Sequence, residues 1–150
     1  MSDLTDLYQE VILDHNRRPR NYGVLAGANR KAKGHNPLCG DRLTVFLEMD
    51  GDRIADIRFE GSGCAISKAS ASLMTDAVKG QNLADVLSLF ERFQAMVTSP
   101  LEVDAGDSTL GKLEALAGVR EFPVRIKCAS LAWHTLKAAL SASPETAVTE

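Results

Sequence analysis

Residues 42–60 read RLTVFLEMDGDRIADIRFE, and the predicted fold is built around this stretch. In its first half, every second position is apolar, which is the pattern of a strand with one buried face: Leu43, Val45, Leu47 and Met49. The pair Asp50-Gly51 predicts a hairpin turn, because a type I′ turn needs positive φ at both central residues. The return strand runs to Glu60 and places on one face Ala55, Ile57 and Phe59. The sequence therefore predicts an antiparallel pair of strands.

Helical periodicity surrounds this hairpin. Apolar spacing predicts helices over about 3–16, 64–80, 83–97, 113–117 and 123–140. We expect an extended loop over 21–38 and irregular chain over 98–111. The predicted fold class is α+β, a small antiparallel β-sheet (hairpin 42–60) packed against several α-helices. No break in composition divides the chain, so we expect one domain over 1–150, with 141–150 as a disordered acidic tail.

The composition excludes several functional classes. The chain has 150 residues, of which 45% are apolar and 25% charged, as in ordinary globular proteins. A formal net charge of −3 gives no general signal for nucleic-acid binding, which depends on clustered positive charge. No apolar run is long enough to span a bilayer, and the acidic start lacks the features of a signal peptide. We expect a cytoplasmic protein with no nucleic-acid or membrane partner.

Three cysteines, Cys39, Cys64 and Cys128, stand in distinctive settings. Disulfides are disfavoured in the cytoplasm, so these residues are buried thiols, metal ligands or reactive thiols. In Cys39-Gly40-Asp41 a thiol and a carboxylate lie two residues apart around a glycine, which lets both turn towards one ion. Cys64 follows a glycine turn and begins a helix, where amide N–H groups and the helix dipole stabilise a thiolate.

Together with Asp41, the three thiols make four potential ligands, which is the coordination number of tetrahedral zinc. Their spacing matches no zinc finger, so the pattern allows convergence without establishing it. Zinc held by three thiolates and one carboxylate would carry a net charge of −2. Two cations precede Cys128 in the sequence: Lys127 is adjacent to it, and Arg125 lies about one helical turn before it. Both are candidate compensating cations, although both also suit an ordinary solvated helix face.

Three motifs resemble those of the IscU/NifU-type iron–sulfur cluster assembly proteins. They are Pro37-Leu38-Cys39-Gly40-Asp41, Gly61-Ser62-Gly63-Cys64-Ala65-Ile66-Ser67, and Arg125-Ile126-Lys127-Cys128-Ala129-Ser130-Leu131-Ala132-Trp133. The resemblance extends over nearly the whole chain except the tail. Classical IscU proteins have histidine where this chain has Lys127, and they lack a segment corresponding to about 95–118. Both features resemble the SufU branch of the family.

This resemblance implies an α+β fold with Zn²⁺ held by Cys39, Asp41, Cys64 and Cys128. It implies a zinc-dependent sulfurtransferase that accepts persulfide sulfur from a cysteine desulfurase of the SufS type, rather than an independent small-molecule enzyme. It also implies that Cys39 leaves the metal and acts as the catalytic nucleophile. Downstream iron–sulfur assembly proteins would receive the sulfur.

Two alternatives remain open at this point. The same residues could hold iron or an Fe–S cluster, in a scaffold that assembles [2Fe–2S] and passes it to apo-proteins, because thiolates bind both metals. Alternatively, the chain could be a binding module whose zinc is purely structural. Lys127 argues against a stable scaffold, because a cation occupies the position of a potential extra ligand.

Overall fold

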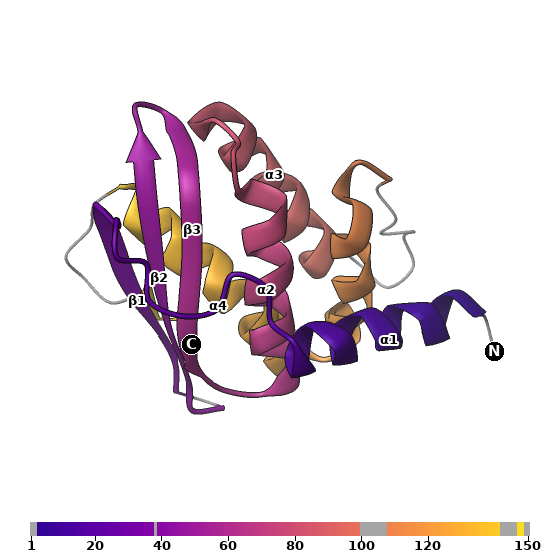
Figure 1. Ribbon diagram of the computed structural model, residues 1–150. Coiled ribbons are helices and arrows are strands. Elements are labelled where there is room, and N and C mark those ends of the chain that lie inside the picture. The colour runs from indigo at the N-terminus through magenta and orange to yellow at the C-terminus, as the bar shows by residue number, and fades with distance from the viewer. Residues whose placement is uncertain (1–2, 38, 100–107, 142–146, 149–150) are drawn as a thin grey trace.

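A computed structural model describes residues 3–37, 39–99, 108–141 and 147–148, shown in Figure 1. The elements in chain order are α1 (Asp3–Arg17), β1 (Arg30–Asn36), β2 (Asp41–Asp50), β3 (Arg53–Ser62), α2 (Ala65–Val78), α3 (Leu83–Thr98), η1 (Ser108–Glu121), α4 (Pro123–Leu140) and β4 (Ala147–Val148). The predicted α+β class is confirmed, with a sheet on one side and helices on the other.

The sheet has the strand order β3-β2-β1-β4, in which β2 is antiparallel to both β1 and β3. The predicted hairpin is confirmed, but its two-residue loop is Gly51-Asp52 rather than Asp50-Gly51. Only Gly51 in this loop has positive φ, at 62°, as in a type II′ turn. The pairing register shifts beside Met49, and this turns Ile54 rather than the predicted Ala55 into the core.

The stretch 21–38, predicted as a loop, contains the strand β1. Its inward positions are Ala32, Gly34 and Asn36, and all three are buried. Sequence periodicity missed the strand because two of its three buried positions carry no apolar side chain. A Cβ at position 34 would collide with Thr135 of α4, so the small residue permits close packing of β1 on that helix.

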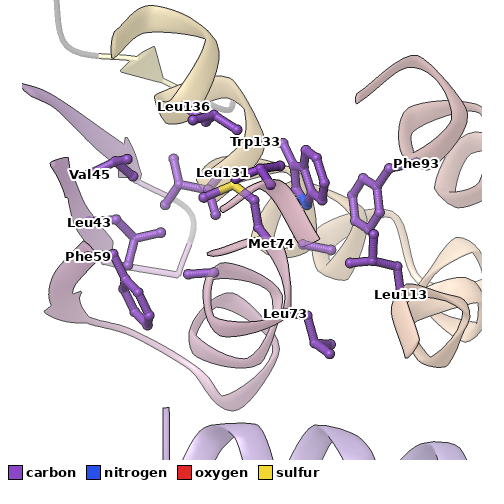
Figure 2. Packing of buried hydrophobic residues seen from close by; sticks show 14 of the residues in the cluster. Leu43, Val45, Phe59, Leu73, Met74, Phe93, Leu113, Leu131, Trp133 and Leu136 are labelled. Atoms are coloured by element: carbon purple, nitrogen blue, oxygen red, sulfur yellow. The ribbon is translucent and has the colours of Figure 1, made fainter. Parts of the chain in front are cut away.

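Helices α2 and α4 pack against one face of the sheet, with α4 behind β1 and β2 in Figure 1. Figure 2 shows Leu43 and Val45 of the sheet near Leu131 of α4 and Met74 of α2, all within one buried cluster. Burial of such side chains contributes about 1.5–3 kcal/mol each relative to exposure. This core holds α2 and α4 in place. Both helices begin near the end of the sheet where the cysteines lie.

The outer helices complete the fold. Asn82 caps α3 by accepting a hydrogen bond from the N–H of Asp85 (2.9 Å), as predicted, and Pro123 occupies the first turn of α4. The predicted short helix 113–117 is longer, because η1 spans Ser108–Glu121 as two segments that meet at Gly111. Of the predicted irregular stretch 98–111, residues 100–107 lie outside the described part of the chain.

The end of the chain differs from the predicted disordered tail at one point. Ala147–Val148 form β4, which pairs in parallel with Gly34 and His35 of β1. The other residues after Ser141 lie outside the described ranges. Among the helices that the structure describes, none is both long and apolar enough to cross a membrane.

Candidate metal centre

The turn between β1 and β2 places Cys39 and Asp41. Asn36 ends β1 and pairs with Asp41 at the start of β2, so the chain turns back between these two residues. Gly40 has a φ of 72°, which residues with a Cβ rarely adopt, and its N–H donates to the carbonyl of Asn36 (2.8 Å). As a result, Cys39 is exposed on the loop, while Asp41 is fully buried at the end of the strand.

Cys64 lies at the N-cap of α2, as the glycine turn before it predicted. The N–H of Ser67 donates to the Cys64 sulfur (3.4 Å), and the N–H of Cys64 donates to Oδ1 of Asp41 (2.8 Å). The Cys64 sulfur is 4.0 Å from Oδ2 of Asp41. The start of α2 is therefore joined to the start of β2, and a helix N-terminus, which favours negative charge, lies beside a carboxylate and a cysteine sulfur.

Cys128 lies early in α4 and is buried. Its thiol donates to the Cys39 sulfur, with the two sulfur atoms 3.3 Å apart. Burial raises the pKa of the Cys128 thiol, because water that would solvate a thiolate is removed, and hydrogen bonds with Cys39, Asp41 and Cys64 raise it further. A thiol in this position needs a cation beside it to become a thiolate.

The structure brings the four predicted ligands together. Ligand atoms of Cys39, Asp41 and Cys128 all lie within 4.8 Å of one another, and Cys64 adjoins Asp41. In a tetrahedral site with Zn–S bonds of about 2.3 Å, two sulfur atoms are about 3.8 Å apart. The sulfur atoms of Cys39 and Cys128, 3.3 Å apart, are slightly closer than this value. The Cys64 sulfur and Oδ2 of Asp41 are 4.0 Å apart, slightly farther than the separation of about 3.5 Å between a sulfur and an oxygen ligand of one tetrahedral zinc ion. The donor set and its spacing thus fit a zinc ion.

The two predicted supporting cations differ in their surroundings. Arg125 is exposed, and its guanidinium carbon lies 4.4 Å from the centre of the Phe122 ring. This cation–π contact turns the guanidinium towards an aromatic surface. Lys127 is half-buried immediately before Cys128. The role of Lys127 as a supporting cation stays a prediction.

Sequence reasoning missed one residue of this centre, Asn36. Its side chain is fully buried, and its Nδ2 donates to Oδ2 of Asp41 (3.2 Å) and to the sulfur of Cys128 (3.4 Å). The available signal was its place in the motif, directly before Pro37. Because 21–38 was predicted as a loop, nothing in the sequence paired Asn36 with Asp41.

The fold and the site together define a small α+β protein with three thiols and a carboxylate gathered at one edge of its sheet. The chain belongs to the NifU-like N-terminal domain family, which it matches over residues 7–129. The resemblance inferred from the three cysteine motifs is thereby confirmed.

Similar proteins cover most of this chain. The zinc-dependent sulfurtransferase SufU of Bacillus subtilis (strain 168) is 46% identical over 136 residues, covering 91% of this chain and 90% of its own length. The iron–sulfur cluster assembly scaffold protein IscU of Streptococcus pyogenes serotype M1 is 43% identical, covering 95% and 88%. A crystal structure from Fervidobacterium islandicum AW-1, provisionally described as a scaffold protein for the SUF system, superposes with a TM-score of 0.80. It is 33% identical and covers 93% of this chain and 99% of that one.

Proposed function

We propose that this protein is a zinc-dependent sulfurtransferase of iron–sulfur cluster assembly, which accepts persulfide sulfur from a cysteine desulfurase. The observation that carries the proposal is the asymmetry of the gathered thiols. Cys39 is exposed on a loop, Cys64 is half-buried at a helix end, and Cys128 is buried within a helix. The Bacillus subtilis relative, named as a zinc-dependent sulfurtransferase, supports the same reading.

The proposed ligands are Cys39, Asp41, Cys64 and Cys128. Bound zinc would keep the thiols ionised at neutral pH and offset the burial of the carboxylate. Cys39 is the proposed nucleophile, because displacing a loop residue disturbs less packing than moving a residue within a helix. The remaining three residues lie on β2, on α2 and in α4, where the core holds them.

Sulfur transfer at Cys39 is a thiol exchange. The Cys39 thiolate attacks the outer sulfur of the partner's persulfide and forms a new S–S bond. The bond between that sulfur and the partner cysteine breaks, and the partner cysteine leaves with the electron pair as a thiolate. No net oxidation or reduction occurs, since one persulfide is exchanged for another. Exposure of Cys39 allows the partner's persulfide to approach.

The proposal includes the biological setting. We infer that the donor is a SufS-type cysteine desulfurase, that downstream iron–sulfur assembly proteins receive the sulfur, and that the protein acts in the cytoplasm as one domain. The lack of a helix able to cross a membrane, within the ranges that the structure describes, is compatible with this setting.

The proposal is tested by metal analysis combined with persulfide transfer. Freshly purified protein should contain about one zinc per chain and should acquire a persulfide at Cys39 when mixed with a desulfurase and cysteine. In Cys39→Ala, transfer should fall to background while the circular dichroism spectrum stays unchanged, because Cys39 is exposed and is not part of the buried core cluster. Transfer to Cys39→Ala at the wild-type rate would refute the assignment.

A scaffold for [2Fe–2S] assembly is the second candidate, and the relative from Streptococcus pyogenes, named as a scaffold, favours it. Thiolates ligate zinc and iron alike, so the donor set does not separate the two functions. Protein purified without oxygen, with a stoichiometric iron–sulfur chromophore and no zinc, would favour the scaffold.

A purely structural zinc makes a different prediction. The core cluster of sheet and helices does not depend on the four ligands, so removal of zinc by a chelator should leave a cooperatively folded protein. We therefore expect the circular dichroism spectrum to be retained after chelation. The melting temperature should be lower, because bound zinc stabilises only the folded state. Loss of the helical spectrum on chelation would favour the structural role.

A further inference from the structure

The side chain of Asn36 connects two of the proposed ligands. It is buried at the end of β1, and its Nδ2 lies 3.2 Å from Oδ2 of Asp41 and 3.4 Å from the sulfur of Cys128. The backbone of β1 fixes this placement, because Asn36 is paired with Asp41 across the sheet and its carbonyl accepts the N–H of Gly40.

The amide group of asparagine has two N–H bonds to donate. At Asn36, the amide nitrogen donates to the Asp41 carboxylate and to the buried sulfur of Cys128. A hydrogen bond to a thiolate draws charge from the sulfur and lowers its nucleophilicity, and hydrogen bonds to charged groups are the stronger kind. The result is two unlike sulfur atoms 3.3 Å apart, one receiving an amide hydrogen bond and the other exposed on a loop.

We propose that Asn36 is a positioning residue that selects which thiol receives sulfur. It holds Asp41 and Cys128 as fixed ligands and leaves Cys39 as the thiolate that reacts. This inference rests on the proposed function, since it concerns the choice among the sulfurs of that site. The proximity of the thiols alone does not make the choice, because Cys128 adjoins Cys39 and would be a competing nucleophile.

The test measures a ratio of reactivities in zinc-loaded protein. Asn36→Leu keeps nearly the same size and removes both donors, while leaving the backbone pairing of β1 possible. Asn29→Leu is the matched control, because the Asn29 amide bonds the backbone of Met49 on the same sheet and Asn29 is exposed in the loop before β1. Each protein is treated with iodoacetamide, and alkylation of each cysteine is followed by mass spectrometry.

In the wild type and in Asn29→Leu, Cys39 should be alkylated first. In Asn36→Leu, the rate at Cys128 should rise about tenfold relative to the rate at Cys39, because one charge-assisted hydrogen bond is lost. After reaction with a desulfurase, persulfide should appear on Cys128 as well as on Cys39. A merely structural role would raise the reactivity of all three thiols together and leave the ratio unchanged.

An unchanged ratio in folded, zinc-loaded Asn36→Leu overturns the inference. If that variant does not fold, Asn36→Ser takes its place, since its short hydroxyl cannot reach both partners and the same shift in ratio is expected. The wild-type measurement separates this outcome from failure of the proposed function. Persulfide on wild-type Cys39 together with an unchanged ratio in the variant would leave sulfur transfer standing and remove only the role of Asn36.

Discussion

Two buried polar clusters contact α2, one at its start and one in its second half. In the second, the hydroxyl of Ser72 accepts the N–H of Arg20 (2.8 Å) and shares a hydrogen bond with Nδ1 of His15 (2.7 Å). Thr75 accepts from the amide of Asn21 (3.0 Å) and donates to the carbonyl of Ser72 (2.7 Å). The two hydroxyls of this α1–α2 cluster are hydrogen-bonded to neutral groups, which is how buried polar groups are usually satisfied.

The cluster at the start of α2 is different, because once its thiols are ionised its acceptors outnumber its N–H donors. Asp41 and three sulfurs share the donors of Asn36, Cys64 and Ser67. A buried group with excess negative charge is costly unless a cation joins it. Where buried donors and acceptors are paired, as in the α1–α2 cluster, their hydrogen bonds join the helices. Where buried acceptors exceed the donors, as at the start of α2, the excess acceptors are suited to bind a metal ion.

The largest expected effect tests this difference in charge. Asp41→Asn keeps the shape of the side chain and one oxygen for the N–H of Cys64, but it removes the charge. Zinc affinity, measured by competition with a chromophoric chelator, should fall at least about 100-fold, since loss of even an outer partner costs 10–100-fold. Asp14→Asn, at the exposed ion pair with Arg20 beside the α1–α2 cluster, should leave zinc affinity unchanged. Equal zinc affinities in Asp41→Asn and Asp14→Asn would show that the charge of Asp41 does not distinguish the metal centre from the α1–α2 cluster.

The next effect concerns the close approach of backbone to Asp41. A Cβ at Gly63 would lie 2.5 Å from Oδ1 of Asp41, so Gly63→Ala forces the carboxylate to move. We expect a loss of about 1–3 kcal/mol in the free energy of unfolding, measured with urea, together with weaker zinc binding. Gly118→Ala is the control, because a Cβ there meets no atom within 4 Å. Equal free energies of unfolding in Gly63→Ala and Gly118→Ala would mean that the packing at the start of α2 is less tight than in the structure.

The hairpin 42–60 could be predicted because its alternation of apolar residues is a direct consequence of one buried face. The strand β1 could not, since its inward positions are shaped by the approach of α4 to Gly34 rather than by apolar burial. Likewise β4 is only two residues long and is defined by its pairing with β1. Strands that are defined by backbone pairing are therefore hard to detect from amino-acid composition.

The candidate ligands could be named from residue type and setting, but their convergence depends on tertiary structure. Cys39 and Cys128 are 89 positions apart and meet only because α4 packs across β1 and β2. The part played by Asn36 was hidden for the same reason that β1 was missed. Residue chemistry can therefore be inferred from sequence, whereas the contacts between neighbours need the register of the sheet.

A smaller effect is expected in the α1–α2 cluster. Ser72→Ala leaves the N–H of Arg20 and Nδ1 of His15 without their shared partner. The free energy of unfolding should fall by about 1–3 kcal/mol, as for other unsatisfied buried groups, while zinc content stays at the wild-type value. The measurements are urea denaturation and metal analysis. Loss of zinc from this variant would show that the two clusters are coupled through α2.

The smallest effect is the pH dependence contributed by His15. Burial lowers the pKa of His15, and the positive charge of Arg20 lowers it further. A neutral imidazole can accept the proton of the Ser72 hydroxyl at Nδ1, while the same hydroxyl accepts the N–H of Arg20. The unfolded chain then binds more protons than the folded one below the ordinary histidine pKa of about 6.5.

This contribution to stability is present above pH 6.5 and is lost as the pH falls towards the lowered pKa. Urea denaturation of the chelator-treated protein between pH 7.5 and 5.5 should show a slope of at most about 1.4 kcal/mol per pH unit from this residue. His15→Gln should remove that part of the slope, because an amide does not titrate in this range. An unchanged slope would mean that His15 has the same pKa in the folded and the unfolded chain, and that burial in the α1–α2 cluster does not favour its neutral form.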